Sequence, residues 1–175
     1  MSGDTSSSMT VRAVIGNPNP GGRTTTVGEA VAAAVADTIG GASGSTVAVE
    51  TIELAHIGPH LFEWGNDEVK TLTEQVASST VNVFACPTYK ATYTGLLKAF
   101  LDNYGNDGLA GTIAVPVMVG ATPRHALAPE VYLRPLLVEL GATVPTRALY
   151  ILDSEMDGLA ADVETWVRAA EDQLT

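Results

Sequence analysis

The feature that most constrains this chain is a regular alternation between short apolar runs and segments with helical periodicity. Strands that alternate with helices along a sequence pair in parallel through right-handed crossovers, with helices on both faces of the sheet. The chain therefore predicts an α/β fold of three layers, built on a doubly wound, five-stranded parallel sheet. The expected strands are residues 11–15, 47–52, a run that ends at 86, 113–119 and 144–151.

The expected helices follow from apolar residues at helical spacing and from residues that start or stop a helix. In the first helix, apolar residues recur every four positions from Val27 to Ile39, and the pair Gly40-Gly41 ends the pattern. The fourth helix, residues 126–140, contains Pro135, which should distort it. The other expected helices begin at Asn66 or Asp67, at Gly95 and at Leu159.

Length and composition indicate one compact domain. The chain has 175 residues, of which 46% are hydrophobic and 17% are charged, and this is enough for a core on both faces of a sheet. We expect residues 10–175 to form a single domain. Residues 1–9 are rich in Ser, Thr and Gly, so we expect a flexible tail there and not a signal peptide. No apolar run in the sequence approaches the roughly 18 residues of a membrane span.

Charge and cysteine content narrow the classes of partner. The formal net charge of −11 disfavours nucleic acid and anionic membrane surfaces, because both need a basic footprint. Cys86 is the only cysteine, so no intrachain disulfide forms and a cytoplasmic location is expected. Because Cys86 ends an apolar strand, we expect its thiol to be buried and inert. The three histidines lack the spacing of a zinc site, so no metal site is expected.

The loop after the first strand has the residue types of an anion site. A glycine-rich stretch, residues 16–22, leads into a helix that opens with Arg23, Thr24, Thr25 and Thr26. A helix N-terminus attracts an anion, and hydroxyls and an arginine add hydrogen bonds to it. Such a loop suits a terminal monophosphate. The alternative is that the threonines only cap the helix and the glycines only turn the chain.

Two further loops are expected at the same edge of the sheet, where open α/β sheets bind their ligands. The loop after the third strand offers hydroxyls, a flat aromatic face and a cation, and this inventory suits a flat ring with polar edges. The alternative is that Tyr89 packs at a rim and that the cations are ordinary surface charges. The two loops consist of Pro87, Thr88, Tyr89 and Lys90, and of Gly120, Ala121 and Thr122 with Arg124 and His125 beyond.

These three blocks resemble the NAD(P)H-dependent FMN reductase family of flavodoxin-like proteins, in particular the small flavin reductases of two-component sulfonate monooxygenase systems. The likeness runs from Val11 to Val144, and its most specific part is the segment from Cys86 to Lys98. The resemblance implies that one set of residues holds the FMN phosphate and a second set borders its ring. The first set is Arg23, Thr24, Thr25 and Thr26, and the second is Pro87, Thr88, Tyr89, Gly120, Ala121 and Thr122; Asn17 and Lys90 are also expected to contact a cofactor.

The resemblance also implies a reaction, hydride transfer from NAD(P)H to N5 of FMN, in which the protein orients two cofactors without a catalytic side chain of its own. Reduced flavin would serve a partner monooxygenase or the free flavin pool. Lys90, Arg124 and His125 would steer the phosphates of the pyridine nucleotide. The alternatives are an enzyme that keeps FMN and reduces quinones or azo compounds, a flavodoxin-type electron carrier without pyridine-nucleotide activity, and a flavin-free binding module.

A homodimer or homotetramer is expected, because relatives build their sites at subunit interfaces. Some relatives carry an extra aromatic residue that forms a π-bulge in the fourth helix. Here Val131 precedes Tyr132, and the sequence leaves open whether a π-bulge forms. Trp64 and Trp166 are expected in the core or at an interface. The apolar candidates for an interface are Phe100, Tyr104, Leu133, Leu136 and Leu137.

Overall fold

The computed structural model describes residues 9–175 and contains a five-stranded sheet in which all neighbouring strands pair in parallel. The expected flavodoxin-like α/β class is therefore confirmed. Of the tail expected at residues 1–9, residues 1–8 lie outside the described part of the chain. The strands are β1 (Thr10–Ile15), β2 (Ala48–Glu53), β3 (Val81–Pro87), β4 (Ile113–Gly120) and β5 (Leu149–Leu152), in the spatial order β2-β1-β3-β4-β5.

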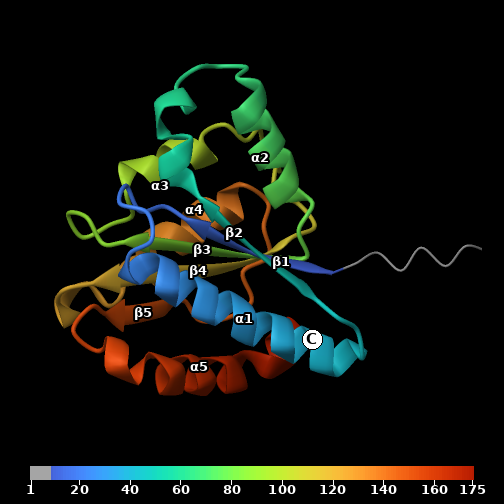
Figure 1. Ribbon diagram of the computed structural model, residues 1–175, viewed down its shortest axis with the longest axis vertical. Coiled ribbons are helices and arrows are strands. Elements are labelled where there is room, and N and C mark those ends of the chain that lie inside the picture. The colour runs from blue at the N-terminus through green and yellow to red at the C-terminus, as the bar shows by residue number, and fades with distance from the viewer. Residues whose placement is uncertain (1–8) are drawn as a thin grey trace, which may run out of the picture.

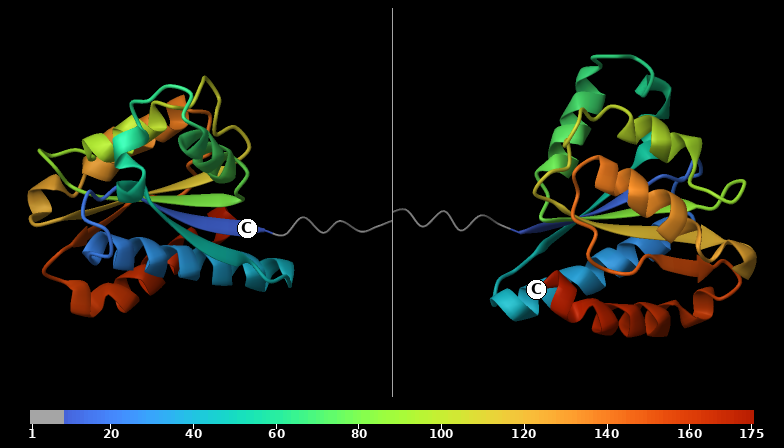
Figure 2. Two further views of the ribbon diagram at one scale, coloured as in Figure 1. Left: turned by 45° about the horizontal axis from the view of Figure 1, so that its top comes forward. Right: turned by 180° about the vertical axis from the view of Figure 1, so that it is seen from behind.

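Helices cover both faces of the sheet, as Figures 1 and 2 show. Helices α1 (Arg23–Ser43) and α5 (Leu159–Leu174) lie on one face; α2 (Asp67–Ala77), α3 (Gly95–Leu101) and α4 (Arg134–Glu139) lie on the other. Because side chains alternate along a strand, Ala13 and Ile15 of β1 pack toward α1 and α5, whereas Val14 packs into the core on the opposite face. None of the helices in residues 9–175 has the length and apolar character needed to cross a bilayer.

Helix α1 begins at Arg23, as expected, but extends beyond its expected end. It continues through Gly40 and Gly41 and ends at Ser43, where Gly44 adopts the left-handed conformation with φ of 67°. A glycine inside a helix is tolerated, and the left-handed C-cap is the position that requires one. At the start, Gly22 is the N-cap residue, so the cap position holds no hydroxyl. The interpretation of the threonines as N-caps is therefore wrong.

Strand β5 is shorter than expected and begins at Leu149 instead of residue 144. Two interactions explain the difference. The guanidinium of Arg134 donates to the backbone oxygens of Val144 and Thr146, so these oxygens do not pair with a strand. Pro145, between them, has no N–H to donate. Residues 144–148 therefore approach the sheet as an irregular segment held by a side chain.

The fourth helical segment is interrupted where a single helix over residues 126–140 was expected. A short 3₁₀ turn (Pro123–His125) comes first, a π-helix (Pro129–Leu133) follows, and α4 then begins at Arg134. Pro135 cannot donate to the carbonyl four residues earlier, and the wider π-turn lies directly before it. The structure thus resolves the question that the sequence left open: a π-helix is present.

The apolar residues expected at a subunit interface mostly belong to the core of this chain. Phe100, Leu133 and Leu137 are fully buried, and Leu136 and Tyr104 pack against the same core cluster. Trp166 is buried as expected and donates from its indole nitrogen to the oxygen of Arg147 at 2.9 Å. Trp64 is 77% exposed, so it is not a core residue of this chain.

Candidate functional site

The carboxyl ends of β1, β3 and β4 lie next to one another at one edge of the sheet. From β1 the chain moves to β2 on one side, and from β3 it moves to β4 on the other, so the sheet reverses its winding between β1 and β3. Open α/β sheets bind ligands in the crevice at such a reversal. The three loops singled out in the sequence therefore meet at the position where a ligand site is expected.

A hollow of about 380 Å³ opens among these loops, within the range usual for small-molecule sites. It brings together eight of the twelve residues expected to bind the cofactor, and two further residues, Val119 and Asp153, complete its wall. The eight are Asn17, Arg23, Thr24, Pro87, Thr88, Tyr89, Gly120 and Ala121. The four that do not line it are Thr25, Thr26, Lys90 and Thr122.

One end of this hollow is formed by the start of α1. The first N–H groups of an α-helix have no partner within the helix and carry its positive dipole end. Arg23 adds a guanidinium there, two-thirds exposed, whose Nη1 lies 3.9 Å from the Asp153 carboxylate across the hollow. Asn17 is buried, and its side-chain oxygen accepts from the N–H of Asn19 at 3.1 Å. This end therefore offers N–H donors and one cation to an anion.

Two of the threonines in the first turn of α1 use their hydroxyls within the protein. Thr25 Oγ1 donates to Glu53 Oε1 at 2.6 Å, and Thr26 Oγ1 donates to the oxygen of Gly22 at 3.5 Å. Thr24, by contrast, lines the hollow. The three threonines therefore have different surroundings, because successive residues of a helix point about 100° apart around its axis.

The loop after β3 forms another part of the wall of the hollow. The backbone N–H of Thr88 donates to the oxygen of Val119 at 2.7 Å, which joins this loop to β4. The hydroxyl of Thr88 is buried and has no hydrogen-bond partner within residues 9–175. A buried hydroxyl without a partner is costly, so this group fits a ligand that supplies the missing bond.

Lys90 lies at the tip of a tight turn closed by two backbone hydrogen bonds between Tyr89 and Thr92. Lys90 and Ala91 both have positive φ, 52° and 68°, which is uncommon for residues with a side chain. The turn holds the exposed ring of Tyr89 at the wall of the hollow and places Lys90 outside that wall. Lys90 is therefore placed to meet a ligand only from the open side.

The loop after β4 is held by β5 from behind. Tyr150 Oη donates to the oxygen of Thr122 at 2.7 Å, and the N–H of Asp153 donates to the oxygen of Gly120 at 3.0 Å. Thr122 itself turns away and accepts from the N–H of Arg124. Neither Tyr150 nor Asp153 was found from the sequence. Asp153 could have been predicted, because it directly follows the fifth strand and the carboxyl ends of parallel strands meet at one edge of the sheet.

Thr94 joins the first and second loops. Its hydroxyl donates to the oxygen of Gly16 at 2.6 Å and accepts from the N–H of Leu97 at 3.1 Å, so one buried side chain also caps α3. A side chain on Gly16 would approach Leu97 Cβ to 2.6 Å, and glycine is therefore needed for this close packing. Sequence reasoning missed Thr94 because its role depends on a residue 78 positions away.

The remaining candidate groups lie apart from this hollow. Burial raises the pKa of the Cys86 thiol to about 12, so Cys86 is protonated at neutral pH and packs in the core, as expected. Arg124 and His125 line a separate hollow of about 210 Å³ with Ala91 and Tyr132. Within residues 9–175 no three or more His, Cys, Asp or Glu side chains gather as a metal site would require.

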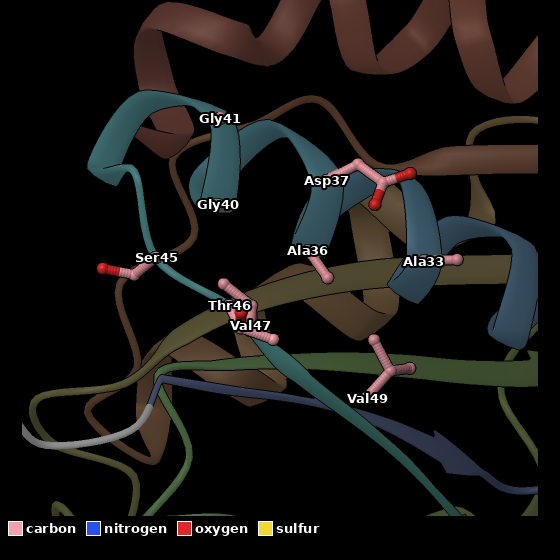
Figure 3. Close-up of a pocket in the computed structure, with 9 residues that line it drawn as sticks. All are labelled: Ala33, Ala36, Asp37, Gly40, Gly41, Ser45, Thr46, Val47 and Val49. Carbon is pink, nitrogen blue, oxygen red and sulfur yellow. The ribbon is translucent and has the colours of Figure 1, made fainter.

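A third hollow, of about 320 Å³, lies between the end of α1 and the edge strand β2, as Figure 3 shows. Its charged group is the carboxylate of Asp37, and its other walls are small residues such as Ala33, Ala36 and Gly40. It lies beside the start of β2, away from the carboxyl ends of the strands, and presents an anion to any ligand. This hollow is therefore not suited to the phosphate that the loop after β1 was expected to hold.

The chain matches the model of the NADPH-dependent FMN reductase family over residues 9–157, and it belongs to that family. The FMN reductase (NADPH) of Escherichia coli strain K12 is 35% identical over 88 residues, which cover 50% of this chain and 46% of that protein. The NADH-dependent FMN reductase SfnE of Pseudomonas putida is 30% identical over 125 residues, or 63% of this chain and 67% of that protein.

The solved apo structure of an NADH:FMN oxidoreductase (EMOB) has a TM-score of 0.82 and 27% identity, and the match covers 96% of this chain and 91% of that one. The chain spans about half the length of several of the curated FMN reductases that it matches. The sequence thus places the chain in this family, and its fold is that of a solved NADH:FMN oxidoreductase.

Proposed function

We propose that this protein is an NAD(P)H-dependent FMN reductase whose FMN lies across the loops that follow β1, β3 and β4. The observation that carries the proposal is the hollow itself. Its wall combines two kinds of chemistry, a helix N-terminus with Arg23 and a Thr88 hydroxyl that has no partner within residues 9–175. A molecule with a phosphate at one end and a polar-edged ring at the other fits both.

In this proposal each loop has a separate task toward FMN. Arg23, Thr24 and the first-turn N–H groups of α1 hold the phosphate, with Asn17 beside them. Pro87, Thr88 and Tyr89 border one side of the ring, and Gly120 with Ala121 borders the other. Thr25, Thr26, Lys90 and Thr122, the four that do not line the hollow, support these segments. Residues 10–175 act as a single flavin-binding domain.

The protein contributes orientation and electrostatics. FMN, when bound, supplies the redox chemistry, because its ring accepts a hydride from a reduced nicotinamide. Lys90, which lies next to the hollow in sequence, and Arg124 and His125, which line the separate hollow, are the candidates to bind the phosphates of NAD(P)H. No side chain is needed as an acid or base. Reduced flavin then passes to a partner monooxygenase or to the free flavin pool.

We further propose a cytoplasmic homodimer or homotetramer. The support is a set of exposed apolar side chains on the π-helix and the segments next to it, and this set replaces the buried residues expected from the sequence. Contiguous apolar surface of this kind is commonly covered by another subunit. Light scattering of the purified protein tests the oligomeric state. The exposed residues are Leu127, Val131, Tyr132 and Val138.

Anaerobic mixing of the protein with FMN and either NADH or NADPH tests the proposed function, with flavin absorbance as the readout. We expect the absorbance to bleach with at least one nucleotide. If neither nucleotide bleaches the flavin although FMN binds, the protein is an electron carrier. If FMN fluorescence does not change on titration, the protein is a flavin-free module. Turnover of a quinone or an azo dye without turnover of free FMN would indicate the enzyme that keeps its flavin.

A further inference from the structure

Glu53 makes two hydrogen bonds to the loop that leads into α1. It is the last residue of β2, and its Oε1 accepts from the backbone N–H of Gly21 at 3.0 Å and from Thr25 Oγ1 at 2.6 Å. These two donors lie on either side of the start of α1 at Arg23. A carboxylate from the edge strand therefore joins the end of the loop to the first turn of the helix.

Both contacts fix features on which the anion-binding end of the hollow depends. Gly21 has φ of 69°, a conformation in which the loop reverses before the helix starts. Thr25 is turned toward β2, which leaves its neighbour Thr24 on the wall of the hollow. Charge-assisted hydrogen bonds of this length are stronger than neutral ones. Glu53, which lies outside the hollow, thus sets the orientation of the first turn of α1 around the helix axis.

The other oxygen of the Glu53 carboxylate has no hydrogen bond to compensate for its burial. Glu53 Oε2 is buried and accepts no hydrogen bond from any group in residues 9–175. Burial of half a carboxylate is costly, and a buried unpaired polar atom in a folded protein calls for an explanation. The bonds made by Oε1 provide this explanation, because no other side chain among residues 9–175 bonds to both Gly21 and Thr25.

From this geometry we propose that Glu53 is a positioning residue, which holds residues 21–25 in their binding conformation and so determines the preference for phosphorylated over unphosphorylated flavin. The inference rests on the proposed function, because it assumes that the loop receives the phosphate of FMN. Glu53 does not line the hollow, so it acts through the backbone of Gly21 and the side chain of Thr25.

The test compares dissociation constants for FMN and riboflavin, which lacks the phosphate, by quenching of flavin fluorescence in the wild type and in Glu53→Ala and Glu53→Gln. In Glu53→Ala we expect FMN to bind about tenfold more weakly, as for the loss of a charged hydrogen bond, with riboflavin unchanged. Glu53→Gln keeps an oxygen acceptor, so it should restore the preference to within about threefold of the wild type.

Glu29→Ala is a matched control. Glu29 Oε1 accepts from Thr51 Oγ1 at 3.0 Å, so it also joins α1 to β2 through a threonine, but further along the helix. We expect its FMN-to-riboflavin ratio to equal that of the wild type. Thr25→Val removes the donor of one of the two hydrogen bonds to Glu53. Like Glu53→Ala, it should lower the preference for FMN over riboflavin. It also serves if Glu53→Ala does not fold.

Hydrogen exchange at the Gly21 amide gives a readout that needs no flavin, and it should be faster in Glu53→Ala than in the wild type. The inference is overturned if Glu53→Ala weakens FMN and riboflavin equally, if the ratio stays at the wild-type value, or if Gly21 exchange is unchanged. Binding of neither flavin by the wild type would refute the proposed function as well. The two failures are therefore distinguishable.

Discussion

The hydroxyl of Tyr150 occupies the space that a side chain on Gly120 would need. A Cβ at position 120 would lie 1.9 Å from Tyr150 Oη, which meanwhile donates to the oxygen of Thr122 at 2.7 Å. Gly120 is therefore needed for its lack of a side chain, since its φ is not positive. A residue of β5 thus determines which residue can stand at the end of β4, on the wall of the candidate flavin site.

Gly120→Ala should accordingly weaken both the fold and the site. We expect a loss of about 1–3 kcal/mol in the free energy of unfolding, because the ring of Tyr150 must move, together with weaker FMN binding. Urea unfolding and flavin titration measure the two effects. Gly41→Ala is the control: it lies inside α1 with open space around it, so it should stabilise the protein by about 0.5–1 kcal/mol. Equal stability of the two variants would contradict this account.

Asp153→Asn should strengthen FMN binding. The Asp153 carboxylate lies 3.9 Å from Arg23 Nη1 and lines the same hollow, so it competes with a phosphate for the guanidinium. For an exposed pair we expect a gain of about two- to fivefold in affinity, which should shrink as ionic strength rises. Titrations at low and high salt measure it. Asp37→Asn, which removes a carboxylate from the hollow of Figure 3, should have no such effect.

Stability below neutral pH should depend on Glu130. Hydrogen bonds from Arg134, and a further one from the N–H of Ala148, lower the pKa of the Glu130 carboxyl below its usual 4.5. A carboxyl whose pKa is depressed by folding stabilises the protein above its unfolded pKa, and this contribution is lost as pH falls through the folded value.

We therefore expect Glu130→Gln to cost about 1 kcal/mol at pH 7, with a difference from the wild type that narrows as pH falls below 4.5. Urea unfolding at a series of pH values measures it. Glu164→Gln disrupts an exposed pair with Arg168 on α5 and should leave the pH profile unchanged. A constant difference between Glu130→Gln and the wild type at all pH values would refute the assignment.

The Cys86 thiol should resist alkylation in the native protein. It is fully buried, and its pKa is raised to about 12, so thiolate is scarce at pH 8. We expect iodoacetamide to modify Cys86 only at the rate at which the protein unfolds, and promptly in concentrated urea. Mass spectrometry of time points measures this. Modification of the folded protein at the rate of a free cysteine would show that the strand end opens.

Most of the fold could be predicted because it depends on local pattern. The apolar residues of β1, β3 and β4 and the four-residue spacing in α1 are consequences of burial on a sheet or a helix face, and each is visible within one short segment. Where prediction failed, a distant residue decided the outcome. Arg134 donates to the backbone oxygens of Val144 and Thr146, and the sequence of residues 144–148 alone does not predict these hydrogen bonds.

The candidate site also contains residues that could be predicted from the sequence and residues that could not. Residues at strand ends or in the loops that follow them, such as Arg23, Thr88 and Gly120, could be proposed from sequence because the sheet topology brings strand ends together. Glu53, Thr94 and Tyr150 could not be proposed, because each side chain bonds to the backbone of a segment that is distant from it in sequence. The separate fates of Thr24 and Thr25 depend on the angular position of each around the axis of α1, which is set by the bond to Glu53.

The walls of the candidate site come from segments as far apart in sequence as Asn17 and Asp153. No fragment that lacks the segment around either residue contains the complete wall, so flavin affinity should appear only once β1 and β5 have both joined the sheet. A ligand that binds only the native state raises stability in proportion to the logarithm of its concentration over its dissociation constant. Flavin supply in the cell would then also set how long each copy of this protein survives before it is degraded.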